Sequence, residues 1–144
     1  MIGLDTSFLV ALTIREHPSH DTAMTLFDDE IKNRDASMAV TPQVLAEYAH
    51  VITDSRRFEH PIIMDEAIEL CEQWWHSREC YQVFASSEAT TIFLGMMREH
   101  RLGRKQQLDT LLAASYHCSG ITKIATTNWR DFKRYGVFEI ISLE

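Results

Sequence analysis

Short apolar runs along the chain alternate with longer segments in which apolar residues recur every three or four positions. The short runs predict strands, and the longer segments predict helices with one apolar face. Strands that alternate with helices indicate an α/β fold, with a central parallel sheet covered by helices on both faces. The predicted strands are residues 1–5, 37–40, 81–84, 121–126 and 138–142.

Capping residues mark where several of the helices begin. Thr6 or Ser7 can cap a helix that starts at Phe8, and Thr41 followed by Pro42 is a strong start for another. The predicted helices are residues 8–14, 18–33, 42–52, 64–76, 87–100 and 105–118, with an irregular segment at 53–63 and a turn around 128–131.

Length and composition fit a single domain over residues 1–144, with 45% hydrophobic and 24% charged residues. No apolar run approaches the roughly 20 residues that a membrane helix needs, and the N-terminus does not read as a secretory signal. We therefore expect a cytoplasmic protein with no membrane partner. Cys71, Cys80 and Cys118 lack the spacing of a zinc site or a disulfide framework, so we expect free thiols.

Four acidic residues are candidates for chemistry. Asp5 ends an apolar run, Glu47 and Asp109 each interrupt the apolar face of a predicted helix, and Asp131 follows the run at 121–125. Taken singly, each has an ordinary explanation, such as a helix cap or a turn. Converging carboxylates repel one another, and a divalent cation is the simplest compensation. Because ligands of parallel sheets bind at the carboxyl ends of the strands, the pattern predicts a metal site there.

The net charge of −7 argues against a nucleic-acid partner, because phosphate contacts dominate that affinity. Two basic segments, residues 98–105 and 130–134, nevertheless adjoin suspected metal ligands. Such clusters are often only solvated surface, but here they are also candidates to contact an RNA backbone. The candidate side chains are Arg101, Arg104, Lys105 and Arg130.

The apolar helices offer more hydrophobic surface than one small sheet can cover. Trp74 and Trp75 lie next to each other on one predicted helix, where we expect a place in the core or in an interface rather than against RNA. Twofold dimers are the commonest soluble assembly, so we expect a homodimer.

Four short motifs, in order along nearly the whole chain, resemble those of one family. They are Gly3-Leu-Asp5-Thr-Ser-Phe-Leu-Val10, Thr41-Pro-Gln-Val-Leu-Ala-Glu47-Tyr48, Leu108-Asp109-Thr-Leu-Leu-Ala-Ala-Ser115 and Thr126-Thr-Asn128-Trp-Arg-Asp131-Phe132. With them the chain resembles PIN-domain ribonucleases, and in particular the VapC toxins of bacterial toxin–antitoxin pairs.

The resemblance implies a PIN-like fold and a site in which the four acidic residues bind Mg²⁺ or Mn²⁺. Some family members carry the last acid where Asn128 or Trp129 stands here, so either Asn128 or Asp131 completes the cluster. The resemblance also implies an RNA substrate, a cognate antitoxin and a homodimer. The residues expected to support the acids are Thr6, Ser7, Thr127 and Asn128.

The first functional hypothesis is therefore a metal-dependent endoribonuclease, the toxin of a VapBC pair, that hydrolyses phosphodiester bonds without a protein nucleophile. Two alternatives stay open. The chain could be a PIN-fold module that binds RNA or protein without cleavage, or a nuclease of RNA processing outside any toxin pair. Metal-dependent cleavage that is lost in an Asp5→Asn variant separates the enzyme from the binding module.

Overall fold

The computed structural model of the protein describes residues 1–144, and its strands form one five-stranded parallel sheet in the order β3-β2-β1-β4-β5. The parallel sheet predicted from the sequence is therefore confirmed. In register, Gly3 pairs with Ala39 on one side and with Ile124 on the other. The strands are β1 (Ile2–Leu4), β2 (Met38–Val40), β3 (Cys80–Gln82), β4 (Lys123–Thr126) and β5 (Glu139–Ser142).

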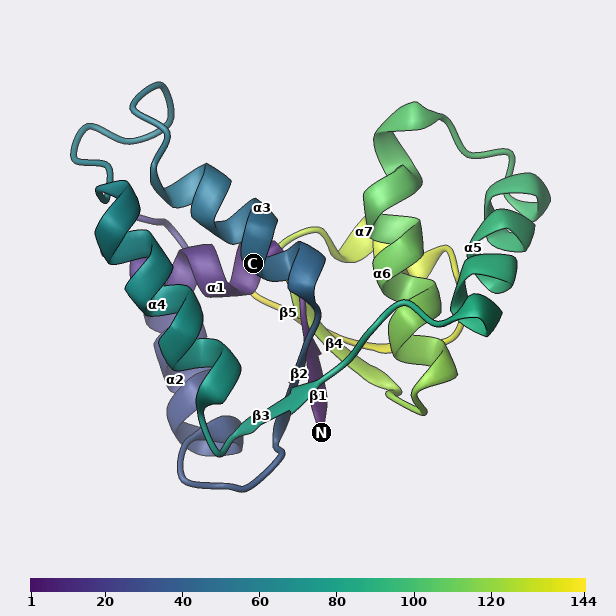
Figure 1. Ribbon diagram of the computed structural model, residues 1–144, viewed down its shortest axis with the longest axis horizontal. Helices are drawn as coiled ribbons and strands as arrows, with labels where there is room; N and C mark the ends of the chain where they lie inside the picture. The colour runs from purple at the N-terminus through teal and green to yellow at the C-terminus, as the bar shows by residue number, and fades with distance from the viewer.

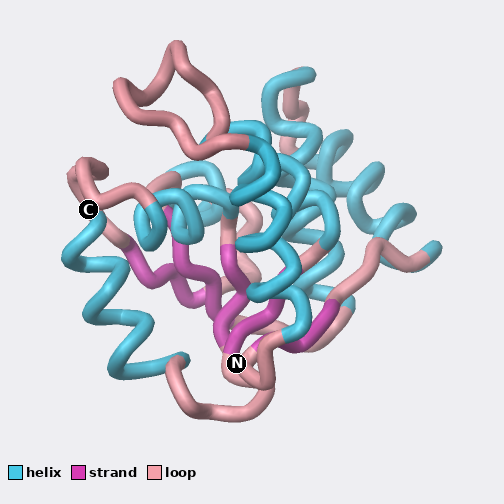
Figure 2. Tube along the Cα trace, turned by 60° about the vertical axis from the view of Figure 1, so that its left-hand side comes forward, coloured by secondary structure: helices cyan, strands magenta, loops and turns pink.

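The helices form two groups, one on each face of the sheet (Figures 1 and 2). From β1 the chain moves outward through β2 to β3, and then returns to the other side of β1 for β4 and β5. Because parallel crossovers are right-handed, this reversal puts the helices before β3 and those after it on opposite faces. The first group is α1 (Thr6–Thr13), α2 (His20–Leu26), the π-helical turn η1 (Phe27–Ile31), α3 (Pro42–Ile52) and α4 (Met64–His76), and the second is α5 (Ser87–Glu99), the 3-10 turn η2 (Arg104–Gln106), α6 (Gln107–Cys118) and α7 (Trp129–Lys133).

The reversal occurs between β1 and β4, which are neighbours in the sheet. At such a switch point the two connections that leave the carboxyl ends turn toward opposite faces, and they leave a crevice in which α/β proteins bind their ligands. Asp5 directly follows β1, and residues 127 and 128 directly follow β4. The fold therefore brings two of the sequence motifs together at this edge.

Tyr116 of α6 fixes that helix against the centre of the sheet. Its buried hydroxyl lies 2.6 Å from the carbonyl oxygen of Leu4 and 2.9 Å from that of Ala39. A Cβ atom at Gly3 would lie only 2.8 Å from the Tyr116 ring, so the close approach of α6 to β1 requires glycine there. The same contact sets the position of Asp109, on α6, relative to Asp5, after β1.

Some predicted boundaries are wrong, each for a local reason. The expected turn at 128–131 is instead the start of the five-residue helix α7 (Trp129–Lys133), which is too short to show a helical periodicity. The predicted helix at 18–33 begins at His20 and ends in a π-helical turn. The helix α1 begins at Thr6 because Asp5, rather than Thr6 or Ser7, is its N-cap.

Trp74 and Trp75 are half-buried and pack within their own chain, as expected of core residues. The Trp74 ring packs edge-on against Phe27, and the Trp75 ring packs in the same way against Phe84. The three cysteines are free. None of the helices is long and apolar enough to cross a membrane.

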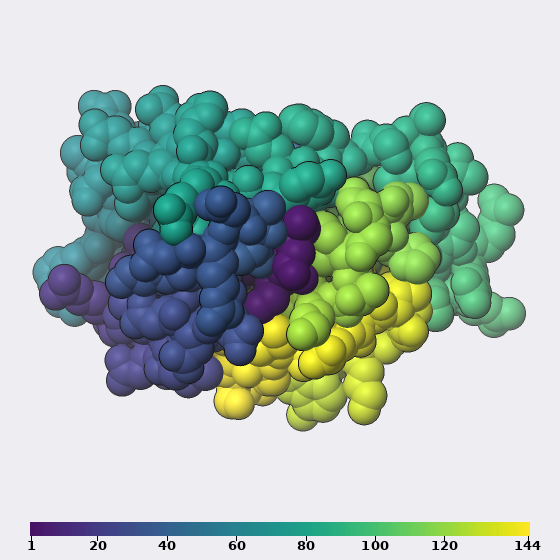
Figure 3. Space-filling view, turned by 90° about the horizontal axis from the view of Figure 1, so that it is seen from below, coloured from purple at the N-terminus to yellow at the C-terminus, as the bar shows by residue number.

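The amino ends of the strands form the opposite edge of the sheet. Seen from that side, the N-terminal residues lie at the surface between segments from the second quarter and the last quarter of the chain (Figure 3). The first residues of β1 are thus at the edge away from the crevice, and the acidic residues lie at the other end of the strand.

Candidate active site

Asp5 is held by hydrogen bonds to both of its carboxylate oxygens. Its side chain is only 6% exposed. One oxygen accepts the backbone N–H of Thr6 at 2.8 Å, which makes Asp5 the cap of α1. The other oxygen accepts the hydroxyls of Ser7 and Thr126, each at 2.7 Å. Burial raises the pKa of the Asp5 carboxyl, and the hydrogen bonds from Thr126, Ser7 and Thr6 oppose that rise.

The two hydroxyls that bind Asp5 are themselves fixed by the segment after β4. The Ser7 hydroxyl accepts the backbone N–H of Thr127 at 3.0 Å, and the Thr126 hydroxyl accepts that of Asn128 at 2.8 Å. Each hydroxyl therefore donates to Asp5 and accepts a backbone N–H from the segment that follows β4. This arrangement locks the carboxyl ends of β1 and β4 around one carboxylate.

Glu47 approaches the same place from α3. Its Oε2 atom accepts the hydroxyl of Thr6 at 3.1 Å, and the residue is otherwise exposed. The same helix face packs Val44 and Tyr48 into the core, so the backbone that carries Glu47 is well fixed. The side chain is thus free to adjust on a rigid support.

Asp109 lies in the first turn of α6, where the positive end of the helix dipole favours a carboxylate. Burial, and then the negative charges of Asp5, Glu47 and Asp131, raise the pKa of Asp109 to about 7. A contact from Asn128 acts in the opposite direction. The other three acids are thus near enough to Asp109 for their charges to act on its protonation.

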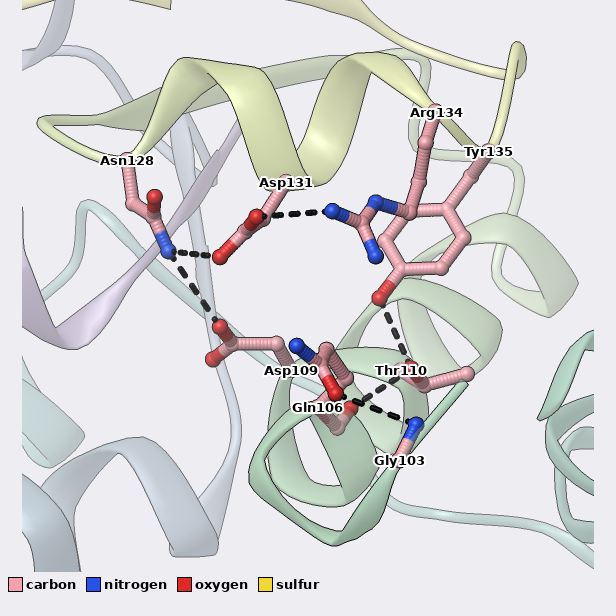
Figure 4. A network of polar contacts seen from close by, with 8 residues as sticks. All are labelled: Gly103, Gln106, Asp109, Thr110, Asn128, Asp131, Arg134 and Tyr135. Carbon is pink, nitrogen blue, oxygen red and sulfur yellow. Dashed lines mark hydrogen bonds and ion pairs between the residues drawn. The ribbon is translucent and has the colours of Figure 1, made fainter. Parts of the chain in front are cut away.

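Asn128 stands between the last two acids (Figure 4). Its amide nitrogen lies 2.7 Å from Asp131 and 3.5 Å from Asp109. The other oxygen of Asp131 pairs with Arg134 at 3.0 Å. Behind them, Tyr135 and Thr110 share a 2.7 Å hydrogen bond that ties the end of α7 to the start of α6.

Three of the four acids line a single cavity of about 500 Å³ at the switch point. Asp5, Glu47, Asp109 and Asn128 are on its wall, and Asp131 is not. Asp131 is set back, where Asn128 and Arg134 bind it. Of the two candidates for the last position in the cluster, the geometry therefore favours Asn128 as the group that faces the cavity.

The donor set suits a hard cation, since Mg²⁺ and Mn²⁺ prefer carboxylate and carbonyl oxygens. Burial and the negative charges of the other acids, which raise the pKa of Asp109, are effects that a bound cation would offset. The carboxylates do not form a preassembled centre, however, because no three His, Cys, Asp or Glu side chains are grouped to hold one ion. Such a spread set of acids suits an ion that keeps several of its water ligands better than an ion that is enclosed entirely by protein ligands.

The predicted supporting residues divide in two. The Thr6 and Ser7 hydroxyls and the Asn128 amide contact the acids, whereas Thr127 contributes its backbone N–H to Ser7. The hydroxyl that does bind Asp5 belongs to Thr126, which the sequence analysis did not select. Leu4 pairs with Ala125 in the parallel sheet, so the next residues, Asp5 and Thr126, lie side by side. Only this strand register distinguishes Thr126 from Thr127 as the partner of Asp5.

The predicted RNA-backbone residues lie outside the acidic cavity. Arg101 lies between α5 and η2, Arg104 and Lys105 lie in η2, and all three are exposed. Arg130, on α7, places its guanidinium 5.2 Å from the centre of the Trp129 ring. The arginine that lines the cavity is instead Arg57, from the connection between α3 and α4.

Fold and cavity together define a class of protein. The sequence profile of the PIN domain matches residues 2–137, and the chain therefore belongs to the PIN domain family. No curated protein sequence matches it.

Solved structures of toxin–antitoxin proteins share the fold. Mycobacterium tuberculosis VapC20, described as a sarcin-ricin loop cleaving toxin, superposes with a TM-score of 0.74 at 20% identity, over 96% of this chain and 98% of that one. Rickettsia felis VapBC2, bound to a DNA fragment from its promoter, superposes with a TM-score of 0.67 at 20% identity, over 99% of this chain and 98% of that one. VapBC-1 from nontypeable Haemophilus influenzae gives 0.62 at 14% identity, over 99% and 98%.

Proposed function

We propose that this protein is a divalent-metal-dependent endoribonuclease and the toxin of a VapBC-type pair. One observation carries the proposal: carboxylates from three separate elements, Asp5, Glu47 and Asp109, line one cavity at the switch point of a PIN domain. The names of the structural neighbours add the toxin–antitoxin context and, for VapC20, the cleaved sarcin-ricin loop.

In this proposal Asp5 and Asp109 are the main ligands of Mg²⁺ or Mn²⁺, and Glu47 binds directly or orients a water molecule. When bound, the ion supplies the positive charge that stabilises a phosphodiester during hydrolysis. Ser7 and Thr126 orient Asp5 and favour its ionised form against the effect of burial, because both hydroxyls donate to it. The Asn128 amide nitrogen donates to both Asp109 and Asp131 and so links the two carboxylates. Asp131 acts through Asn128.

The decisive experiment is RNA cleavage by purified protein with Mg²⁺, with Mn²⁺ and with EDTA, wild type beside Asp109→Asn. We expect discrete cleavage products that need the metal and disappear in the variant. RNA binding without cleavage under all three conditions would favour the alternative of a binding module. Cleavage by a protein with no inhibitory partner encoded beside it would favour RNA processing outside a toxin pair.

The expected antitoxin has a groove of about 420 Å³ available between α1, α2 and α4. Leu12, Met24, Phe27, Leu70 and Trp74 make its floor apolar, which suits the apolar face of a helix. A basic side chain of the antitoxin that enters the acidic cavity would compete with the metal. Calorimetry should therefore show weaker antitoxin binding with increasing Mg²⁺ and in Glu47→Gln.

A homodimer is the expected assembly of the free toxin. Several large apolar side chains stay exposed on the single chain, among them Ile68 on α4, Phe84 after β3 and Leu94 on α5. Burying such side chains at a twofold interface is the usual way to remove them from water. Light scattering at micromolar concentration should give twice the mass of one chain, and a monomeric mass would refute the dimer.

A further inference from the structure

The acidic cavity has a second, non-acidic wall. It comes from Arg57 and Phe58 in the α3–α4 connection and from His17 in the α1–α2 connection, with Val10 and Val51 beside them. Both connections belong to the group of helices α1 to α4 (Figure 1). A cavity of about 500 Å³ is large enough for a small ligand, and more than one kind of surface lines it.

Arg57 supplies positive charge at this wall. Its Nε atom lies 3.4 Å from one oxygen of Asp54, and the Nε atom of Arg56 lies 3.3 Å from the other. Two guanidinium groups thus share one carboxylate, which leaves a net positive charge at the rim of an acidic site. The Arg57 side chain is largely exposed, and a pair with such an arginine adds little to stability, so stability does not explain the placement of Arg57.

A phosphodiester that enters this cavity meets the charges of Asp5, Glu47 and Asp109. A divalent ion can offset that repulsion at the reacting phosphate, and a basic side chain on the wall can do so for a neighbouring phosphate of the strand. A guanidinium binds phosphate oxygens in a fixed two-pronged geometry, and it is always charged. Among the basic side chains, Arg57 is the one on the cavity wall.

Phe58 and His17 give the same wall the means to bind a base. Phe58 is half-buried against the core and still lines the cavity, and unpaired bases stack on such rings. The Nδ1 atom of His17 accepts the backbone N–H of Ser19 at 3.0 Å, so the neutral ring carries its proton on Nε2. That N–H is available as a donor to a base or a ribose.

We propose that Arg57, Phe58 and His17 form a nucleotide-binding subsite beside the acidic cluster. The subsite holds the nucleotide next to the scissile phosphate: Arg57 binds its phosphate, Phe58 stacks on its base, and His17 donates a hydrogen bond to its base or ribose. The proposal rests on the proposed RNA-cleaving function. It implies that the nucleotide at this position is unpaired, because a paired base cannot stack on a side chain.

The test measures RNA binding separately from cleavage and has a matched control in the chain. Arg56 and Arg57 are adjacent and share Asp54, but only Arg57 lines the cavity. In an Asp109→Asn background, which prevents turnover, fluorescence anisotropy with a labelled single-stranded RNA of about a dozen nucleotides gives the Kd of each variant. Arg57→Ala should weaken binding about 10-fold and flatten its salt dependence, and Arg56→Ala should change it less than about 2-fold.

Base stacking is tested with a second pair of probes. Phe58→Leu keeps an apolar side chain in the core but removes the ring, and it should weaken binding of the normal RNA about 5- to 10-fold. Binding of an abasic strand of the same length should not change. A loss for both probes, together with a lower melting temperature, would show that Phe58 only supports the fold. His17→Leu should weaken binding of the normal RNA about 3-fold, because one hydrogen bond is lost.

Equal Kd values for the Arg56→Ala and Arg57→Ala variants would overturn the subsite. The failure of the subsite can be distinguished from the failure of the proposed function. A wild-type protein that cleaves RNA while the two arginine variants bind alike refutes only the subsite. A wild-type protein that never cleaves, with Arg57→Ala alone impaired in binding, refutes only the nuclease.

Discussion

The two halves of the candidate site are held in different ways. At the strand ends, Asp5 is buried and receives three hydrogen bonds from neutral donors. On the helices, Asp109 and Asp131 are partly exposed, and their fixed contacts are one shared amide and one arginine. The position of Asp5, the strand-end half, is therefore fixed by the backbone of the sheet. The positions of Asp109 and Asp131, the helix-borne half, are fixed by side chains that can move.

This difference indicates a division of labour. A carboxylate that already has its hydrogen bonds keeps its position when a cation arrives, and it loses little conformational freedom on binding. A carboxylate whose pKa is raised by burial and by its acidic neighbours gains most from the cation's charge. We therefore expect Asp5 to determine where a metal binds and Asp109 to determine how strongly the empty site is destabilised.

The largest effect is expected from neutralising either main acid. Asp5→Asn and Asp109→Asn should each lower RNA cleavage by at least about 100-fold, because each removes a charge that binds the metal. Mg²⁺ should raise the melting temperature of the wild type, since it binds only the native state, and the rise should shrink in both variants. Cleavage assays and thermal unfolding, with and without metal, check this prediction.

The fold should survive both changes, since asparagine is also a good helix cap at position 5. Circular dichroism of the two variants provides the control. Full activity with unchanged metal dependence in both would contradict the catalytic role of the cluster.

The next effect separates two adjacent threonines. Thr126→Val keeps the shape of a buried side chain but removes the hydroxyl that binds Asp5 and the backbone of Asn128. Groups that orient a metal ligand typically contribute 10- to 100-fold to metal affinity or activity, and we expect a loss in that range. Thr127→Val is the matched control, because Thr127 contributes its backbone N–H. Similar losses in both would show that the hydroxyl of Thr126 has no special part.

These two threonines also show which parts of the site can be predicted from the sequence and which cannot. The motifs around Asp5, Glu47 and Asp109 are local patterns, and the alternation of strands and helices predicts the parallel sheet without knowledge of long-range contacts. The choice of Thr126 over Thr127 depends on the pleat of β4, where a shift of one residue turns a side chain to the other face. Only the pairing of β4 with β1 fixes that choice.

The sequence patterns did not indicate the non-acidic wall of the cavity, for a different reason. Arg57 and Phe58 lie in a connection without any helical or strand period, so their sequence neighbourhood indicates only an irregular segment. Their place in the cavity results from the packing of α3 beside α1, which no local pattern encodes. The basic segments next to the motifs were easier to see, but their side chains lie outside the cavity.

A smaller effect is expected at the back of the helix-borne half. Asp131→Asn should lower cleavage by about 3- to 10-fold, because Asp131 acts on the cavity through Asn128 and is already paired with Arg134. Asn128→Ala should cost more, since it removes the amide that faces Asp109. Cleavage rates under single-turnover conditions compare the two variants. A loss in Asp131→Asn as large as in Asp109→Asn would mean that Asp131 is itself a main ligand.

The smallest effect concerns stability without metal. The folded-state pKa of Asp109 is about 7, above its ordinary value of 3.8. Between these pH values the folded protein binds the proton more tightly than the unfolded chain, so stability falls as the pH rises through this window. The full shift would correspond to about 4 kcal/mol, but solvent screens a partly exposed carboxylate, and we expect about 1 kcal/mol.

Urea unfolding in EDTA at about pH 5 and pH 8 measures the effect, with Asp109→Asn as the reference that lacks the titrating group. The wild type should lose about 1 kcal/mol more than the variant between the two pH values. His17 has a lowered pKa and acts in the opposite direction, but it is present in both proteins, so its contribution cancels in the difference. Asp5 has a raised pKa, acts in the same direction as Asp109 and interacts with it, so the difference reports on Asp109 together with its effect on Asp5. Added Mg²⁺ should remove most of the difference, because the cation replaces the proton as the group that offsets the charge of Asp109. Equal pH dependence in the two proteins would mean that Asp109 is well solvated. The negative charges near Asp109 would then not destabilise the metal-free protein, and a bound metal would have no such repulsion to offset.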